Sequence, residues 1–171
     1  MSYFNYFSPI LYDPKGDGNA KLVTDILSRI RIRVSMKKEI VMLDRYNVKE
    51  NETPEIVADK HHGSPHYHWV VMLLNNISDV HHDWPKSTRQ IQKYISTKYT
   101  SAQLEEVHHY EIAQTSGDTT IKIEVENTTY PGASPISNLE YETALNEEKR
   151  KIDLLRNDYL GLFTEEFANL V

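Results

Sequence analysis

The sequence contains no cysteine, which excludes disulfides, thiolate metal sites and a cysteine nucleophile. This absence is compatible with assembly in a reducing cytoplasm. Long apolar runs are missing too, since the longest, Trp69 to Leu74, is far shorter than the ~20 residues needed to cross a bilayer. The opening residues MSYFNYF lack the basic leader and apolar region of a secretory signal. Export by that route is therefore not expected.

Apolar residues are in short supply for a chain of this length. Hydrophobic residues make up 39% of the 171 residues, and the mean hydropathy is −0.57. A globular chain of this size buries about 70% of its unfolded surface, so the core should be modest. An extended protein that completes its burial against partners fits this composition better than an enzyme with a deep pocket.

The chain also lacks an excess of positive charge, because its 25 acidic residues outnumber 19 lysines and arginines and the net charge is −6. That argues against nucleic acid as the main partner, since phosphate binding needs clustered lysine and arginine. The charge is uneven, however. Residues 14–38 hold seven basic and two acidic side chains, and residues 139–171 hold four basic and eight acidic ones. The two ends could be complementary, although two solvated faces are the plainer interpretation because exposed ion pairs are weak.

The segment from Tyr46 to Ile77 contains clear start and stop signals for helices. Residues 46–50 alternate apolar with polar, as a half-exposed strand does. Thr53 and Pro54 form a cap and first-turn pair for a helix that ends at Gly63, and Ser64-Pro65 repeats that pair for a second helix. The second helix is apolar on most faces and should be largely buried. The predicted order is strand, helix, helix.

The N-terminal residues 3–12 form an aromatic arm that is too short and too proline-interrupted to bury itself. Such an arm packs either on a partner or on its own domain, because aromatic anchors serve cores and interfaces alike. Asp13 to Asn19 reads as a turn-rich loop, Leu22 to Leu27 as a short helix, and the arginine-isoleucine alternation that follows as strand-like. The predicted partner-interface residues are Tyr3, Phe4, Tyr6, Phe7, Arg29, Arg31, Arg33, Phe163 and Phe167.

The rest of the chain predicts helices around a hairpin. Ser87 can cap a helix through Tyr99, and residues 110–125 alternate as two strands of a hairpin with one buried face. Residues 127–137 read as a linker, and a helix should run from about Asn138 to Arg150. The apolar line of this helix is marked by Tyr141, Leu145 and Ile152. A brief strand is expected from Lys151 to Arg156. Asp158 can cap the last helix.

Six histidines lie between His61 and His82, and imidazole is a common zinc ligand. Their spacing does not supply the H-E-x-x-H geometry of a catalytic helix, so we expect structural roles and no metal, cofactor or catalytic residue. Asp13-x-Lys15-x-Asp17 resembles a calcium loop, but a lysine replaces an oxygen ligand. Trp69 and Trp84 could stack on a sugar, although Trp69 lies in the most apolar helix and favours core packing.

A strand that leads through ETPEIVADK into two small helices resembles the LysM module, in which a second strand soon follows. Here that closing strand is missing or delayed. The whole order of motifs resembles a narrower family, the LysM-like baseplate wedge subunits (gene product fifty-three) of T-even-like contractile-tailed bacteriophages. The matching pieces are YFSPILYD, LVTDIL, ETPEIVADK, GSPHYHWVVMLLNNI, DWPKS and NEEKRKIDLLR. No catalytic motif is carried over.

The resemblance implies an α+β fold, with a small LysM-like core, an additional hairpin, C-terminal helices and an extended N-terminal arm. The expected segments are 1–38, 39–100, 101–136 and 137–171. The implied function is that of a non-enzymatic wedge component of the virion tail baseplate, made in the host cytoplasm, which joins other wedge proteins and sheath- or hub-proximal tail proteins in a symmetric ring. The alternatives are a peptidoglycan-binding LysM module and, least favoured, a histidine-based metalloenzyme.

Overall fold

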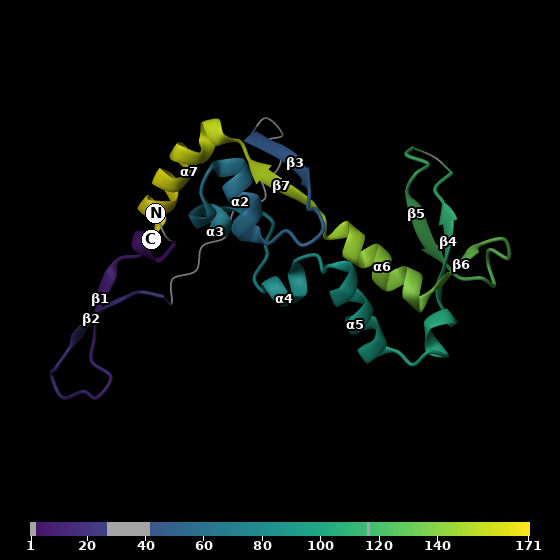
Figure 1. Ribbon diagram of the computed structural model, residues 1–171, viewed down its shortest axis with the longest axis horizontal. Coiled ribbons are helices and arrows are strands. Elements are labelled where there is room, and N and C mark those ends of the chain that lie inside the picture. Colours follow the sequence, from purple (N-terminus) through teal and green to yellow (C-terminus); the bar gives the residue numbers. More distant parts are fainter. Residues whose placement is uncertain (1–2, 27–41, 116) are drawn as a thin grey trace. The chain divides into compact units, whose positions relative to one another are not determined.

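The computed structural model describes residues 3–26, 42–115 and 117–171 (Figure 1). Helices and strands are mixed along the chain, which confirms the predicted α+β class. The described chain forms two compact units. Unit 1 combines the residues up to Trp84 with Lys151–Val171, and unit 2 is Pro85–Arg150. The division into four segments stays a prediction.

Unit 1 is built on two antiparallel strands that lie far apart in the sequence. Strand β3 (Leu43–Asn47) pairs with β7 (Lys151–Leu155), so that Leu43 faces Leu155 and Tyr46 faces Ile152. Four helical elements follow β3 in the chain: α2 (Pro54–His62), η3 (Pro65–Tyr67), α3 (His68–Leu74) and α4 (Val80–Asp83). The closing strand is thus delayed rather than missing, and unit 2 is inserted before it. The predicted brief strand at Lys151 is confirmed.

The capping residues of α2 and η3 behave as the sequence predicts. Thr53 Oγ1 accepts the Ile56 N–H at 3.4 Å, and Pro54 occupies the first turn. Gly63 ends α2 with φ at 72°, a left-handed conformation that suits glycine. Ser64 Oγ then accepts the His66 N–H at 3.4 Å. The chain therefore reverses between α2 and η3 with almost no linker.

Two neighbouring apolar clusters form the core of unit 1. The first joins α2, α3 and β7 through Val57, Val71 and Leu154, with Trp84 and Ile152 beside them. The second holds α7 (Asn157–Leu170) against α3 and the N-terminal residues, and its buried members are Phe7, Trp69, Val70, Leu74, Leu155 and Phe167. The prediction that Trp69 is a core residue is confirmed. Ile152 belongs to β7 rather than to a helical apolar line.

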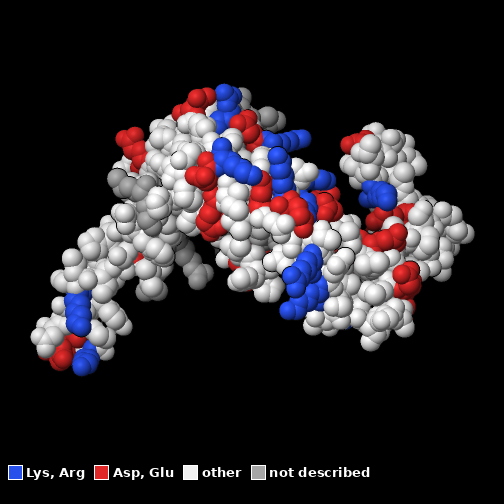
Figure 2. All heavy atoms as spheres, in the orientation of Figure 1, with Lys and Arg blue, Asp and Glu red and all other residues white. Residues whose placement is uncertain are grey.

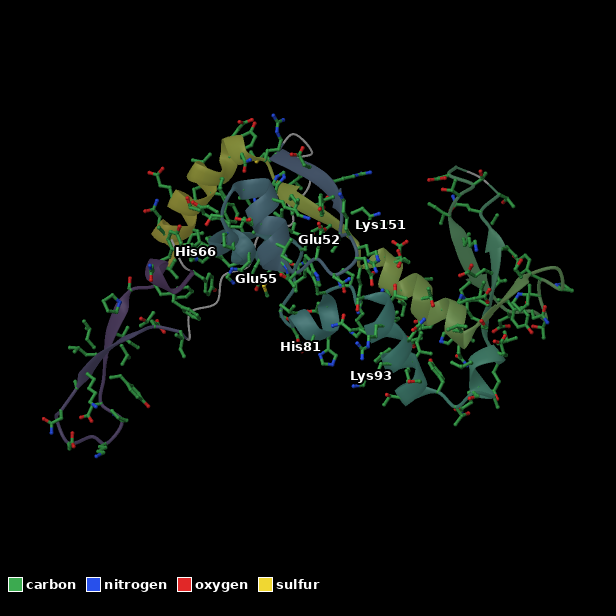
Figure 3. The ribbon with its side chains drawn as sticks, in the orientation of Figure 1. Glu52, Glu55, His66, His81, Lys93 and Lys151 are labelled. Carbon is green, nitrogen blue, oxygen red and sulfur yellow. The ribbon has the colours of Figure 1, made fainter. Side chains whose placement is uncertain are left out.

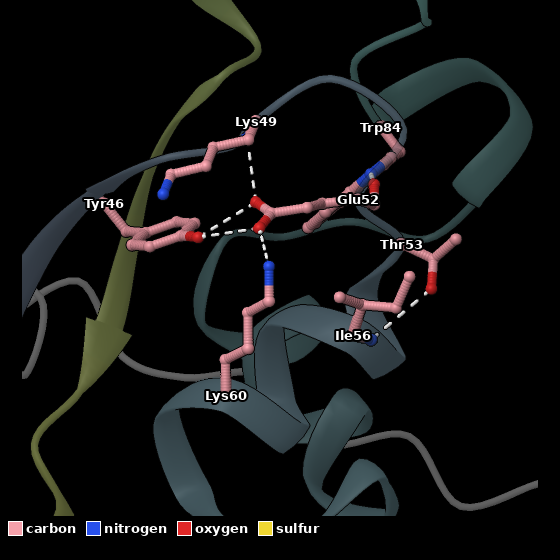
Figure 4. A network of polar contacts seen from close by, with 7 residues as sticks. All are labelled: Tyr46, Lys49, Glu52, Thr53, Ile56, Lys60 and Trp84. Atoms are coloured by element: carbon pink, nitrogen blue, oxygen red, sulfur yellow. Dashed lines mark hydrogen bonds and ion pairs between the residues drawn. The ribbon is translucent and has the colours of Figure 1, made fainter.

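A buried carboxylate fixes the turn between β3 and α2 (Figure 4). Glu52 accepts hydrogen bonds from the Tyr46 hydroxyl at 2.9 Å, the Lys49 N–H at 2.8 Å and Lys60 Nζ at 2.5 Å. Trp84 Nε1 donates to the Glu52 carbonyl at 2.7 Å. Burial raises the pKa of the Glu52 carboxyl, but these donors outweigh it and hold that pKa below its ordinary value.

The N-terminal part of unit 1 is a short 3₁₀ turn followed by a hairpin. η1 (Tyr3–Tyr6) precedes β1 (Pro9–Tyr12), which pairs antiparallel with β2 (Lys21–Thr24). The predicted helix at Leu22 is therefore wrong. Asp13 explains the hairpin, because its carboxylate accepts the N–H groups of Gly16 and Gly18, each at 2.8 Å, and so closes the turn-rich loop. The predicted arginine-isoleucine strand lies outside the described residues.

Unit 2 combines two helices with a three-stranded sheet. Ser87 caps α5 (Thr88–Lys98), as predicted, and forms a capping box with Gln90. The predicted hairpin is also present as β4 (Val107–Ala113) and β5 (Lys122–Val125). The predicted linker is wrong at its end, since β6 (Ser134–Ser137) joins the other edge of β4. The remaining elements are η4 (Gln103–Glu105) and α6 (Asn138–Glu148).

Unit 2 buries few apolar side chains. On α6 the buried residues are Glu142 and Asn146, whereas Leu145 is 41% exposed, so the predicted apolar line is wrong. Glu142 accepts hydrogen bonds from Lys98 Nζ and the Tyr99 hydroxyl, and Asn146 bonds both backbone groups of Lys86. Among the described strand residues of the sheet, none is buried. The expectation of one buried sheet face is wrong as well.

The closing strand can be tested with two matched leucines. Replacing the fully buried Leu154 of β7 with alanine should lower the free energy of unfolding by about 3 kcal/mol, because it leaves a cavity in the first cluster. Replacing the exposed Leu145 should cost about 0.5 kcal/mol or less. Urea unfolding of both variants measures the difference, and equal losses would contradict the delayed strand.

Glu52 predicts a defined pH dependence. Because its folded pKa lies below the ordinary 4.5, its stabilising contribution is complete above that value and is lost as pH falls through the folded pKa. Glu52→Gln should lower the free energy of unfolding by about 1 to 2 kcal/mol at neutral pH. This figure is kept small because the partner Lys60 is half-exposed and solvent screens the ion pair. The variant should also lose less stability than the wild-type chain as the pH falls. Chemical denaturation at several pH values measures this. Asp59→Asn is the exposed control, and an identical acid limb in both variants would refute the role of Glu52.

Candidate interaction surfaces

The hairpin β1–β2 presents aliphatic side chains on both of its faces. Cross-strand register places Leu11 opposite Leu22 on one face and Ile10 opposite Val23 on the other. Leu11 is 73% exposed and Leu22 is 68% exposed. Figure 2 shows charged side chains at the loop end of this hairpin and uncharged ones along its strands. The paired strands are thus an apolar surface that the described residues leave open.

The aromatic arm folds back onto unit 1. The ring of Tyr6 lies 5.5 Å from that of Trp69 and 5.6 Å from that of Phe167, while the ring of Tyr3 lies 4.8 Å from that of Phe7. Phe167 in turn lies 4.6 Å from Trp69. Edge and tilted contacts of this kind add to the stabilisation from burial. Residues 3–7 of the arm therefore pack on their own domain, whereas residues 9–12 form β1 of the exposed hairpin.

This packing places the predicted interface residues in different settings. Phe7 and Phe167 are buried, Tyr3, Tyr6 and Phe163 are half-buried, and Phe4 is 55% exposed. Arg29, Arg31 and Arg33 lie outside the described residues. A partner interface at these positions stays a prediction, and Phe4 is the aromatic residue most available for it.

The histidines occupy separate local hydrogen bonds. His61 Nε2 lies 3.0 Å from the Leu155 carbonyl, His62 Nδ1 lies 2.8 Å from Asn157 Oδ1, and His82 Nδ1 lies 2.6 Å from Asp79 Oδ2. Burial lowers the pKa of His62. In Figure 3 the labelled His66 and His81 lie on different elements and do not converge. The described part of the chain holds no group of three or more histidine and carboxylate residues placed to bind a metal ion.

Neither tryptophan offers a ring to a sugar. Trp69 is buried in the second apolar cluster, and Trp84 is buried in the first, where its Nε1 donates to the Glu52 carbonyl. The turn between β3 and α2 is likewise occupied by the chain's own side chains, since Tyr46 and Lys60 both bond Glu52. The sugar-stacking role considered for the two tryptophans has no exposed ring to support it.

A shallow cleft lies along the two strands of unit 1. It has a volume of about 360 Å³ and is lined by Arg45, Tyr46, Asn47, Lys151, Ile152 and Asp153. Arg45 and Asp153 face each other across the strands, as do Asn47 and Lys151. Opposite charges set directly across a sheet attract one another. The lining therefore has the make-up of a solvated sheet surface rather than a group of converging catalytic side chains.

Comparison with known families settles which group of proteins shares this organisation. The family model described as base plate wedge protein 53 matches residues 3–124, more than half of the chain. The chain belongs to this family. The match runs from η1 through most of β5, and so includes the hairpin β1–β2, the helical elements α2 to α4 of unit 1 and the first part of unit 2. No curated protein matches the chain.

Membership in the base plate wedge protein 53 family places the protein in the tail baseplate of a phage virion, as a structural component. A structural family of this kind lends no support to catalysis. It also implies interaction with other baseplate components. The strand β7 and the helix α7 lie beyond the matched residues, so the likeness of the core to a LysM module stays a prediction. Among the described residues, no helix is long and apolar enough to cross a membrane.

Two features of these surfaces were not predicted from the sequence. We predict from the sequence an aromatic arm, a loop and a helix where the hairpin β1–β2 lies, although PILY and KLVT flank a proline- and glycine-rich turn, which is a hairpin signal. The exposed sheet of unit 2 was expected to have a buried face. Nothing in its alternating pattern reveals whether a covering layer exists, because the alternation is the same in both cases.

The aromatic cluster predicts opposite results for two neighbouring phenylalanines. Phe7→Ala should lower the free energy of unfolding by about 2 to 4 kcal/mol, because it empties a space between Tyr3 and Phe167. Phe4→Ala should cost about 1 kcal/mol or less, since that ring is mostly in solvent. Thermal and urea unfolding measure both. A larger loss for Phe4 than for Phe7 would show that the arm does not pack as described.

Proposed function

We propose that this chain is a non-enzymatic structural subunit that joins neighbouring wedge proteins during assembly of a contractile tail. The observation that carries the proposal is the open apolar hairpin β1–β2 in a chain of the base plate wedge protein 53 family. Its partners are other wedge proteins and, more distantly, sheath- or hub-proximal tail proteins. In this role the protein contributes buried surface and fixed geometry rather than chemistry.

The energetics of the hairpin support a docking role. An isolated two-stranded hairpin is marginal in water, and the side chains of Leu11, Tyr12, Leu22 and Ile26 are more than half exposed. Exposed apolar side chains gathered on one hairpin in this way are typical of a site of interaction. Covering it with a partner would stabilise both the hairpin and the complex, at roughly 25 cal/mol for each Å² of apolar surface removed from water.

Multiple copies in a symmetric ring are part of the proposal. Each copy then needs only moderate contacts, because the ring makes later binding events intramolecular. Unit 2 buries few apolar side chains, and its helix α6 makes its buried contacts through Glu142 and Asn146. This small core supports the role of a subunit that is stabilised by its neighbours. Peptidoglycan binding, the alternative considered from the sequence, is not proposed, because both tryptophan rings are buried.

The hairpin can be tested in phage assembly. The double variant Leu11→Ser with Leu22→Ser should fold, since both side chains are exposed, but should fail to enter wedge complexes and should yield tailless or unassembled particles in complementation of a phage lacking the gene. Ile56→Ser, which removes an isolated exposed aliphatic residue from α2, should complement normally. Circular dichroism of each purified variant controls for folding.

Two outcomes would count against the role. Normal assembly with the hairpin variant would remove the hairpin from the proposal. Normal tails in a phage that lacks the whole gene would overturn the structural role itself.

A further inference from the structure

Strand β5 is an open sheet edge. The strand order is β5-β4-β6, and no other described strand pairs with the outer side of β5. The opposite edge contains Pro135 in β6, which lacks an N–H and so discourages the addition of a strand. β5 contains neither a proline nor a bulge. It is therefore the edge to which another strand can be added.

The hydrogen-bond pattern shows which backbone groups this edge offers. The Gln114 N–H donates to the Ile121 carbonyl at 2.8 Å. Directly opposed residues of an antiparallel pair alternate between exchanging hydrogen bonds and pointing away. Ile123 and Val125 therefore direct their carbonyl and N–H groups toward β4, as Ile121 does its carbonyl, whereas the Ile121 N–H donates to the Asp118 carbonyl at 3.2 Å. Lys122 and Glu124 direct their backbone groups outward. The open edge presents the donors and acceptors of these last two residues.

The sequence along this edge is self-complementary. Residues 121–125 read Ile-Lys-Ile-Glu-Val. If a second copy lies antiparallel with Ile123 on the two-fold axis, Ile123 meets Ile123, Ile121 meets Val125, and Lys122 meets Glu124 twice. Lys122 and Glu124 then form the hydrogen-bonded pairs, as their outward backbone groups require. Apolar side chains lie together on one face and opposite charges on the other.

Other registers are less favourable. A shift of one residue places charged side chains opposite aliphatic ones. Centring the pair on Glu124 sets two carboxylates directly opposite each other, which is destabilising. The register centred on Ile123 is the one in which every opposed pair within residues 121–125 is complementary.

Features of the single chain point to the same partner. Within the sheet Glu124 faces Glu111, a like-charge pair. Glu111 is compensated by His109 Nε2 at 3.0 Å and Lys122 Nζ at 3.3 Å, but no cation among the described residues is paired with Glu124. The aliphatic side chains Ile121 and Ile123 are 49% and 42% exposed. A second copy would bring a lysine to Glu124 and aliphatic cover to both isoleucines.

We propose that β5 is a self-association edge, through which two copies of this chain pair antiparallel about Ile123 and join their three-stranded sheets into one. Charged residues on an edge strand often prevent such pairing. Charges of one sign prevent two copies of a strand from pairing because they repel each other. Lys122 and Glu124 have opposite signs, so each attracts the other residue of the second copy across the two-fold axis. The proposal does not depend on the baseplate role, because it concerns the full-length chain in solution.

Charge exchange in the full-length chain tests the register. The molar mass should rise with concentration toward that of a dimer in sedimentation equilibrium. Lys122→Glu and Glu124→Lys, studied separately, should each weaken self-association on the order of tenfold or more, because like charges then oppose each other. An equimolar mixture of the two variants should recover association, as should the double variant. Glu126→Lys, with the same charge change as Glu124→Lys outside the paired segment, is the matched control.

Single cysteines give a second test, because the chain has none of its own. Non-hydrogen-bonded pairs place their Cα atoms about 4.5 Å apart, which is within the range that a disulfide accepts. Under mild oxidation Ile123→Cys should form a covalent dimer. Ile121→Cys and Val125→Cys should not do so alone, but a mixture of these two should form a mixed dimer.

The proposal is overturned by any of three results. The wild-type chain could stay monomeric at its highest soluble concentration. It could form a dimer that responds equally to Glu124→Lys and Glu126→Lys. Finally, cross-linking could be as efficient at residue 121 alone as at residue 123. Recovery in the mixture of charge variants excludes misfolding as the cause of their weakened association.

Discussion

The pairing of β3 with β7 is the constraint on which unit 1 depends. It brings Leu154 and Ile152 into the first apolar cluster and Leu155 into the second, and it sets the start of α7, so that Phe167 can reach Trp69. Roughly a hundred residues separate the two strands, yet the entropy cost of closing a chain loop grows only slowly with its length. A whole second unit can therefore be carried between α4 and β7. The cost falls on the folding rate rather than on stability, because the pairing is non-local.

The two units satisfy their buried groups in different ways. Unit 1 has two apolar clusters and one buried carboxylate whose donors are all in place. Unit 2 relies on Glu142, which is bonded to Lys98 and Tyr99, and on Asn146, which bonds the backbone of Lys86. Polar networks specify geometry but supply less net stability than apolar burial. The exposed hairpin in unit 1 and the sheet without a buried residue in unit 2 are the surfaces that we propose other proteins cover.

Local signals in the sequence predicted local structure well. Thr53, Gly63, Ser64 and Ser87 cap or end helices where expected, because a cap depends on a few adjacent residues. The predictions were wrong where the secondary structure depends on pairing with a strand elsewhere in the chain. Leu22 to Thr24 became a strand by pairing with β1, and Ser134 to Ser137 by pairing with β4. Asp158 does not cap α7, which begins at Asn157 without a side-chain cap. The burial of Glu142 and Asn146 in place of Leu145 could not be predicted, since it depends on which cation and which backbone lie opposite.

The central claim is that the open surfaces of this baseplate wedge protein become buried on assembly. Hydrogen exchange tests it most directly, by comparing backbone amide protection in the free chain with that in assembled wedges. Amides that β3 and β7 donate to each other should be protected in both states, because this strand pairing holds the core of unit 1 together. Amides in β1 and β2 should exchange quickly in the free chain and slowly after assembly, since a covered hairpin no longer opens to solvent. Equally fast exchange of β1 and β2 in both states would contradict the claim.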